Sequence, residues 1–334
     1  MRRTRADREA AEQRLAPAAT RSTRSRGRAR AEEPDDLRTA FERDRDRILH
    51  SKALRRLKHK TQVFLNPEGD HYVTRLTHAL QVTQIARALA AGLGLNEPLA
   101  EAIALGHDVG HSPFGHTGEE ALSPYVAGGW HHAAQSVRIY QVLEDCNLTW
   151  EVRDGIRAHS WQIAPPPATP EGWCVRHADR IAYLTHDALD ALRAGVLSVE
   201  DLPATVRAHL GAPGSEWIGR MIRAVVDHSV EVGQVAMRPD TLQVAQRLRG
   251  FMFERVYCGE HAAGQKQAAV TVIRRLVDYH LQHPSELPAS YRDSDADPVT
   301  QVVDYVSGMT DRFALLLHER LFEPIVLPAP ARVR

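Results

Sequence analysis

The spacing of apolar residues constrains the fold of this chain more than any other feature. From Asp36 onward, apolar residues recur mostly at intervals of three and four positions, and strict alternation rarely extends beyond four positions. The first pattern is typical of amphipathic α-helices and the second of half-buried β-strands. The sequence therefore predicts an all-α fold. With 43% apolar and 25% charged residues, a chain of this length can bury a substantial core.

Domain organisation follows from linkers and charge. Residues 35–327 contain no obvious linker, so we expect one domain there, with a core over about residues 75–190 and a C-terminal helical part over about residues 200–327. The N-terminal residues 1–34 differ, because the first 30 hold ten arginines against three acids, a net charge of about +7. This composition is typical of a disordered tail, and contact with single-stranded nucleic acid is the alternative.

Membrane and redox signals are weak in this sequence. No apolar run approaches the length of a secretory or membrane-spanning segment. Cys146, Cys174 and Cys258 are widely separated and form neither a zinc knuckle nor a disulfide framework. We therefore expect a cytoplasmic protein with reduced thiols and no membrane contact.

Three of the predicted helices carry the candidate chemistry. One spans residues 75–91, a second begins at the N-cap Asn96 and runs to Asp108, and a third spans residues 171–194. Another helix is expected to begin near Thr117, which has an acid at capping-box spacing three residues later. The remaining predicted helices cover residues 132–145, 151–160, 215–233, 240–256, 262–283 and 298–320.

The adjacent residues His107 and Asp108 indicate a metal site. Neighbours in an α-helix point about 100° apart, so both can face one ion only where the helix ends, and Gly110 and Pro113 supply that ending. Seven of the 18 histidines fall within residues 71–132, under a fifth of the chain. Imidazoles and carboxylates at this density are typical of a metal site with acid and base groups nearby.

Two further residues complete the candidate ligand set. His78 lies on the helix of residues 75–91, and Asp179 lies on the helix of residues 171–194. Taken alone, each would be an ordinary structural histidine or surface acid. Together with His107 and Asp108 they offer two nitrogen and two oxygen donors for one divalent ion, and Mn, Mg, Fe, Ni, Co and Zn all suit such a shell.

The order of these four residues resembles the HD phosphohydrolase superfamily, an all-helical group of metal-dependent phosphate hydrolases. Longer strings narrow the resemblance to the bacterial deoxyguanosinetriphosphate triphosphohydrolase-like proteins, over roughly residues 35–324. The strings are Arg43-Asp-Arg-Asp-Arg-Ile-Leu-His50, Arg56-Leu-Lys-His-Lys-Thr-Gln-Val-Phe64, Thr74-Arg-Leu-Thr-His78, Gly110-His-Ser-Pro-Phe-Gly-His-Thr-Gly-Glu119 and Tyr305-Val-Ser-Gly-Met-Thr-Asp311. The resemblance implies an HD-domain helical bundle that hydrolyses deoxynucleoside triphosphates (dNTPs) to deoxynucleoside and inorganic triphosphate. It also implies a homo-oligomer and an allosteric dNTP.

The resemblance further implies catalytic roles. His116 would be the general acid or base and Glu119 its orienting carboxylate, while His111 and His132 would lie near the phosphates. The alternative for Glu119 is an acid favoured by the first turn of a helix. Family members usually have Asn after the histidine that corresponds to His132, whereas this chain has Ala133. The support of His132 by its neighbour is therefore expected to differ from that in the family.

The resemblance places four more residues at the substrate. Arg75 and Tyr183 would approach phosphate, and Asp187 and Gln62 would approach the deoxyribose. The alternatives are that Arg75 pairs with an acid and that Tyr183 and Asp187 form a polar stripe that faces neighbouring helices.

Two other functions remain open at this level. One is a different HD-superfamily nucleotidase or phosphohydrolase, because the metal motif alone serves many phosphoesters. The other is a nucleotide-sensing or nucleic-acid-binding protein with weak turnover, in which the Arg-rich segment contacts phosphates. A Walker-type P-loop is absent from the sequence, which disfavours an ATPase mechanism. The preferred base cannot be read from the sequence.

Overall fold

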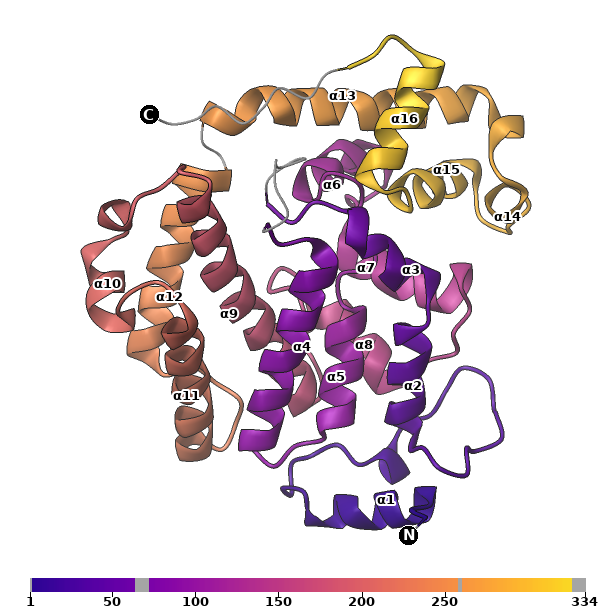
Figure 1. Ribbon diagram of the computed structural model, residues 1–334. Coiled ribbons are helices and arrows are strands. Elements are labelled where there is room, and N and C mark those ends of the chain that lie inside the picture. The colour runs from indigo at the N-terminus through magenta and orange to yellow at the C-terminus, as the bar shows by residue number, and fades with distance from the viewer. Residues whose placement is uncertain (1, 64–71, 258–259, 326–334) are drawn as a thin grey trace.

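The computed structural model describes residues 2–63, 72–257 and 260–325 (Figure 1). Within these ranges the chain forms sixteen α-helices and no β-strand, with only two isolated β-bridges, so the predicted all-α fold is confirmed. The helices are α1 (Arg5–Ala11), α2 (Ala40–Leu49), α3 (Lys52–Arg56), α4 (Arg75–Gly92), α5 (Glu97–Gly106), α6 (His116–Leu122), α7 (His132–Arg138), α8 (Trp150–Ala158), α9 (Pro170–Arg193), α10 (Ala204–Leu210), α11 (Ser215–Val232), α12 (Pro239–Met252), α13 (Glu260–Gln282), α14 (Ala289–Arg292), α15 (Pro298–Ser307) and α16 (Asp311–Leu321).

The larger hydrophobic core surrounds helices α4, α5 and α9, which pack against one another. Helix α4 shows why: its buried residues Val82, Ile85, Ala86 and Leu89 recur at intervals of three and four, so they share one face. Burial of a side chain of the size of Ile85 or Leu89 contributes about 1.5–3 kcal/mol. The same helix carries His78 near its N-terminus, so packing of the apolar face fixes the position of that imidazole.

A second, smaller core joins helices α13, α15 and α16 to helix α6. Its buried residues include Leu122 of α6, Ile273 and Leu276 of α13, and Val303 and Val306 of α15. In Figure 1, α13, α15 and α16 cover α6 at one end of the molecule. The helix that bears two of the candidate catalytic residues therefore rests on the C-terminal part of the chain.

The N-terminal segment differs from the sequence prediction of a disordered tail. Residues 5–11 form α1, and Figure 1 shows that this segment runs along the end of the bundle. Arg28 pairs with the fully buried Asp44, whose second carboxylate oxygen accepts hydrogen bonds from the backbone and side chain of Thr149. Thr20 donates to Glu171, which is also fully buried. The arginine content suggested disorder, but carboxylates far away in the sequence pair with this segment and order it.

Several predicted helix boundaries shift. Asn96 caps α5 as predicted, because its side chain accepts a hydrogen bond from the backbone N of Leu99. The predicted start near Thr117 is confirmed within one residue, since α6 begins at His116, but the expected capping box at Thr117 is not formed: the N-cap is Gly115, which has a φ of 59° and provides no side-chain cap. The predicted helix of residues 298–320 is two helices, since the chain leaves the helical path at Gly308 and restarts at the N-cap Thr310.

Two further sequence predictions concern membrane-spanning segments and the cysteines. No helix in the described part of the chain is both long and apolar enough to cross a bilayer. Cys146 and Cys174 are free thiols, and burial raises the pKa of the Cys174 thiol. Cys258 and the predicted end of the domain at residue 327 lie outside the described residues.

Candidate active site

Local structure explains how two consecutive residues face one point. His107 is the C-cap of α5 and Asp108 follows in a turn, so the helix ends where the two side chains are needed. The side chain of Ser136 on α7 holds this turn, because its hydroxyl donates to the His107 carbonyl at 2.7 Å and accepts from the Gly110 N at 2.9 Å. A Cβ at Gly110 would overlap the backbone of α7. Only glycine permits this approach.

The four predicted ligands converge from α4, α5 and α9. His78 Nε2 lies 3.1 Å from Asp179 Oδ1 and 3.9 Å from Asp108 Oδ2. His107 Nε2 lies 3.4 Å from Asp108 Oδ1 and 3.8 Å from Asp179 Oδ1. Metal–ligand bonds of about 2.0–2.2 Å place neighbouring donor atoms roughly 3–3.5 Å apart. These separations therefore fit donors of a single ion after small side-chain adjustments.

The donor chemistry fits a cation as well. His107 Nδ1 donates to the Ala104 carbonyl at 2.7 Å, which leaves the Nε2 lone pair buried and without a hydrogen-bond partner among the residues that the structure describes. An unpartnered buried acceptor is costly unless a metal or proton fills it. Burial opposes ionisation of Asp179, but the neighbouring His78 and His107 outweigh it and lower the pKa of this carboxyl. The residues present thus suit a divalent ion.

Arg75 pairs with a candidate ligand. Its Nη1 donates to Asp108 Oδ2 at 2.7 Å, and the side chains of both residues are buried. Burial alone would raise the pKa of Asp108, but His107, His111 and Arg75 together hold it well below its usual range. The structure thus brings about the acid pairing that the sequence left open for Arg75. A phosphate contact by its remaining guanidinium nitrogens stays a prediction.

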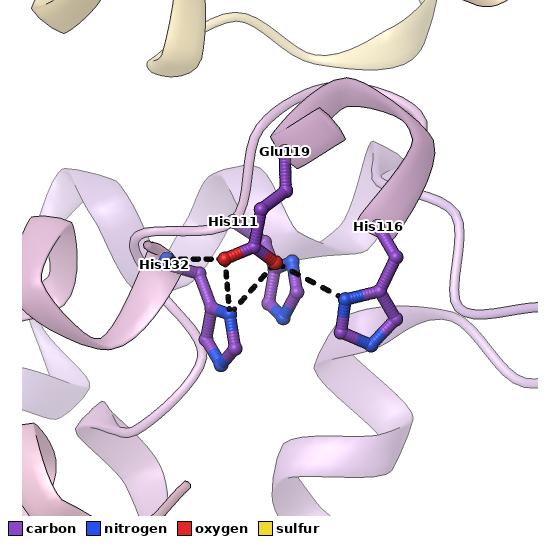
Figure 2. Close-up of side chains that lie close together, drawn as sticks. All are labelled: His111, His116, Glu119 and His132. Carbon is purple, nitrogen blue, oxygen red and sulfur yellow. Dashed lines mark hydrogen bonds and ion pairs between the residues drawn. The ribbon is translucent and has the colours of Figure 1, made fainter. Parts of the chain in front are cut away.

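Beside the metal ligands lies a second group of side chains, formed by His111, His116, Glu119 and His132 (Figure 2). Glu119 Oε2 lies 3.1 Å from Nδ1 of His116 and 3.1 Å from Nδ1 of His132. The rings of His111 and His132 stack with centroids 3.9 Å apart. Burial opposes ionisation of Glu119, but the hydrogen bonds from His116 and His132 outweigh it and lower the pKa of this carboxyl. Glu119 therefore orients both imidazoles, whereas a merely helix-capping acid would contact neither.

His159, which the sequence reasoning missed, joins the two groups. It is buried at the end of α8, with Nε2 3.2 Å from His132 Nε2 and 3.9 Å from Asp108 Oδ1. Its Nδ1 donates to the Ile156 carbonyl, and burial, followed by the nearby His107, lowers its pKa to about 3. A neutral ring with Nδ1 protonated can only accept at Nε2. His132 must then donate to it, so His159 supports His132 where Ala133 does not.

The residues predicted to contact sugar and phosphate have mixed surroundings. Asp187 is buried and accepts from the Tyr257 hydroxyl at 2.6 Å, and burial raises its pKa to about 8. Tyr183 lies one helical turn before it on α9, partly buried. Gln62 is half-buried, and its side-chain oxygen has no hydrogen-bond partner within the described ranges; it follows Thr61, which bridges to the start of α4. No hydrogen bond joins Gln62, Tyr183 and Asp187 to one another in the described part of the chain.

Comparison with known proteins identifies the family. The HD domain family matches residues 75–184, and the phosphohydrolase-associated domain family matches residues 235–320. A deoxyguanosinetriphosphate triphosphohydrolase-like protein of Caldanaerobacter subterraneus subsp. tengcongensis is 48% identical, with 93% of each chain covered. Two other relatives carry the same description. The protein from Clostridium perfringens strain SM101 is 41% identical, with 91% of this chain and 92% of the relative covered. The protein from Desulfatibacillum aliphaticivorans is 43% identical, with 93% of this chain and 95% of the relative covered.

The chain belongs to the deoxyguanosinetriphosphate triphosphohydrolase-like family. The predicted resemblance is confirmed, and membership of an HD phosphohydrolase family supports hydrolase activity. HD domains are metal-dependent, and the four predicted ligands all lie within the matched residues 75–184. The roles of individual residues stay predictions.

Two basic side chains that the sequence reasoning missed lie near Tyr183 in this triphosphohydrolase-like protein. Arg180 follows the candidate ligand Asp179 on α9, and its guanidinium lies 3.8 Å from the ring centroid of Trp161. Arg180 and Arg249 both act on the pKa of Tyr183, which burial raises and the two cations lower. Two arginines close to Tyr183 suit a polyanion. The sequence could not reveal Arg249, because it lies on α12, far from the motifs.

The phosphohydrolase-associated part of this family member supports the loop before α6. Asp311 accepts from the Phe114 N at 3.0 Å and from the Thr61 N at 2.9 Å. The buried Lys60 donates to the carbonyls of His111 and Ser307. Phe114 has a φ of 62°, a conformation that non-glycine residues rarely adopt. The surrounding contacts therefore hold the loop in a strained shape that directs His116 toward Glu119.

Proposed function

We propose that this protein hydrolyses dNTPs to deoxynucleoside and inorganic triphosphate in a metal-dependent reaction. One observation carries the proposal: a two-histidine, two-aspartate cluster lies directly beside a histidine–glutamate pair, with His111 Nε2 3.3 Å from Asp108 Oδ1. This arrangement places a site for a divalent cation next to a histidine that can donate a proton. The printed names of the relatives, deoxyguanosinetriphosphate triphosphohydrolase-like proteins, support the substrate class.

His78, His107, Asp108 and Asp179 would hold one divalent ion. Such an ion supplies Lewis-acid stabilisation of phosphate charge and lowers the pKa of a water molecule. Ionised Asp108 and Asp179 suit this role, because their pKa values are lowered by the imidazoles around them.

His116 would deliver the proton that the reaction needs. When water attacks the α-phosphorus, the bond from phosphorus to the 5′-oxygen breaks and that oxygen must be protonated. The His116 side chain is 78% exposed, so substrate can reach it, and its Nδ1 faces Glu119. That contact leaves Nε2 for the 5′-oxygen and fixes the orientation of the ring. His111 would donate to a phosphate oxygen, and His132, whose two ring nitrogens face Glu119 and His159, would lie beside the phosphates and hold His111 in place through the stacked rings.

The remaining side chains would position the nucleotide. Arg75, Arg180 and Tyr183 offer donors to the phosphates, and the uncommitted amide of Gln62 suits a sugar hydroxyl. Asp187, with a pKa of about 8, is protonated at neutral pH and would donate to the 3′-hydroxyl as well as accept from it. We also expect a cytoplasmic homo-oligomer in which dNTPs activate turnover.

Product analysis tests the proposal. The purified protein is incubated with Mn²⁺ or Mg²⁺ and a panel of dNTPs, and the products are separated by anion-exchange chromatography. We expect inorganic triphosphate and deoxynucleoside. Monophosphate, diphosphate or cyclic products would instead favour another HD phosphohydrolase, and dNTP binding without products would favour a nucleotide sensor.

A variant links this reaction to the metal site. In Asp179→Ala or His78→Ala we expect loss of bound metal and of turnover, with an unchanged far-ultraviolet circular dichroism spectrum. Full activity in either variant would contradict the proposed coordination.

A further inference from the structure

The group of His111, His116, Glu119 and His132 has the composition of a transition-metal site of its own. One ligand atom from each of the four residues lies within 4.8 Å of the others. Figure 2 shows the three imidazoles gathered around the Glu119 carboxylate. None of these residues belongs to the two-histidine, two-aspartate cluster described above. Three nitrogen donors and one carboxylate oxygen form a donor set that zinc prefers.

The geometry is close to that of a tetrahedral site. With zinc bonds of about 2.0–2.1 Å, ligand atoms of a tetrahedron lie about 3.3–3.4 Å apart. Glu119 Oε2 already lies 3.1 Å from Nδ1 of both His116 and His132. The ring of His116 stands nearly perpendicular to that of His111, at 77°, so these two imidazoles approach from different directions, whereas the rings of His111 and His132 stack at 13°, and one of them must turn for both to face the same ion. His116 is largely exposed and can rotate to complete the shell.

A second observation points to a ligand. His111 is 2% exposed, and its Nδ1 has no hydrogen-bond partner among the described residues. Its other nitrogen faces Asp108 at 3.3 Å. A buried imidazole nitrogen without a partner is uncommon in a folded protein. A cation shared with the stacked ring of His132 would satisfy it.

We propose that these four residues form a second cation site, selective for zinc over magnesium, and that zinc bound there inhibits the enzyme. Selectivity follows from the donors, because Mg²⁺ prefers an all-oxygen shell and imidazole suits zinc. Inhibition rests on the proposed function: zinc occupies lone pairs of His116 and Glu119, so the imidazole can no longer carry the proton for the 5′-oxygen. Binding itself does not depend on that function.

Metal stoichiometry tests the site. The purified protein is dialysed against micromolar Zn²⁺, and bound zinc is measured by mass spectrometry. We expect about two ions per chain in the wild type, about one in His116→Ala, about one in Asp179→Ala, and none in the double variant. His116→Ala changes an exposed side chain, so the fold is preserved. Co²⁺ added to Asp179→Ala should give the intense visible absorption of tetrahedral cobalt, and the double variant should not.

A matched control excludes adventitious surface binding. His228 and Glu231 on α11 repeat the same spacing, with Nδ1 and Oε2 3.0 Å apart, but lack further histidines in contact. His228→Ala should keep the wild-type zinc content. If His228→Ala and His116→Ala lose zinc equally, or if Asp179→Ala binds none, the second site does not exist.

Inhibition is measured separately. With Mn²⁺ held in excess, zinc at the concentration that fills the second site should lower dNTP turnover at least tenfold, and a zinc chelator should restore it. Filling of the second site without inhibition would overturn the inhibitory role. If the protein releases no triphosphate under any condition, the proposed function fails, while the stoichiometry still decides whether the site exists.

Discussion

Removal of Arg28 should destabilise the protein far more than its place in an arginine-rich terminal segment suggests. The side chain of Arg28 is 9% exposed and that of its partner Asp44 is fully buried. Arg28 also donates to the carbonyls of Asn147 and Ala40 at 2.7 and 3.1 Å. In Arg28→Ala the Asp44 charge stays buried, with only the hydrogen bonds from Thr149 to stabilise it. Breaking one partner of a buried pair costs about 3–5 kcal/mol.

That loss is a large share of the total stability of a typical domain, about 5–15 kcal/mol. Urea unfolding followed by circular dichroism measures it. The destabilisation should shrink as the pH falls, because burial already raises the pKa of Asp44 and loss of the cation raises it further. The folded variant then takes up a proton more readily than the unfolded chain, so the penalty of the buried charge is greatest at neutral pH.

Arg30→Ala is the matched control. Arg30 belongs to the same segment and pairs with Asp145, but both side chains are more than half exposed. An exposed pair contributes about 0–1 kcal/mol. If Arg28→Ala costs no more than Arg30→Ala, the N-terminal segment does not clamp the bundle and the composition-based prediction of a disordered tail is correct.

Three further predictions concern the site. Glu119→Gln should lower kcat about 10²–10⁴-fold with little change in bound metal at the HD ligands, and an unchanged kcat would remove Glu119 from proton transfer. Asp187→Asn should gain stability relative to the wild type as the pH rises from about 4 to about 8. In that range the unfolded wild type ionises this carboxyl, whereas the folded protein, in which burial raises the pKa of Asp187 to about 8, keeps it protonated, and the variant cannot ionise in either state. Parallel melting temperatures across that range would contradict the assignment. Gly115→Ala should impair turnover more than Gly128→Ala, since both glycines have positive φ but a Cβ at Gly115 would lie 2.8 Å from Arg75 Nη2, whereas one at Gly128 meets nothing within 4 Å. Equal kinetic effects in the two variants would show that backbone strain alone is responsible.

The local spacing of apolar and capping residues was sufficient to predict most of the helices. Residues 75–91 and 171–194 were predicted closely, because an amphipathic repeat and capping residues act over a few positions. The break at Gly308 was missed, since an isolated glycine is compatible with a continuing helix and only the second core shows that α15 and α16 turn apart. The start of α6 was predicted within one residue, but its N-cap was not, because the positive φ angles of Phe114 and Gly115 belong to a loop that is held by a distant residue, Asp311.

The features that the sequence did not predict depend on contacts between residues that are far apart along the chain. Arg28 and Asp44 are 16 residues apart, and Asp44 and Thr149 are 105 apart, so composition reported the charge of the segment and not its partners. His159 was missed for a similar reason. It is one histidine among 18, with no motif around it, and it gains meaning only when α8 packs against α7 and α5.

The division between the two hydrophobic cores has a chemical consequence. The predicted metal ligands stand on α4, α5 and α9 in the larger core, whereas His116 and Glu119 stand on α6, which rests on the smaller core. Since the cores meet at this site, the cation and the proton donor can be disturbed independently. A substitution that weakens the packing of α13 and α15 against α6 would displace His116, whereas the predicted metal ligands on α4, α5 and α9 would keep their positions. Substitutions in the packed faces of the C-terminal helices should therefore affect the proposed proton transfer by His116, although their side chains do not enter the proposed ligand set.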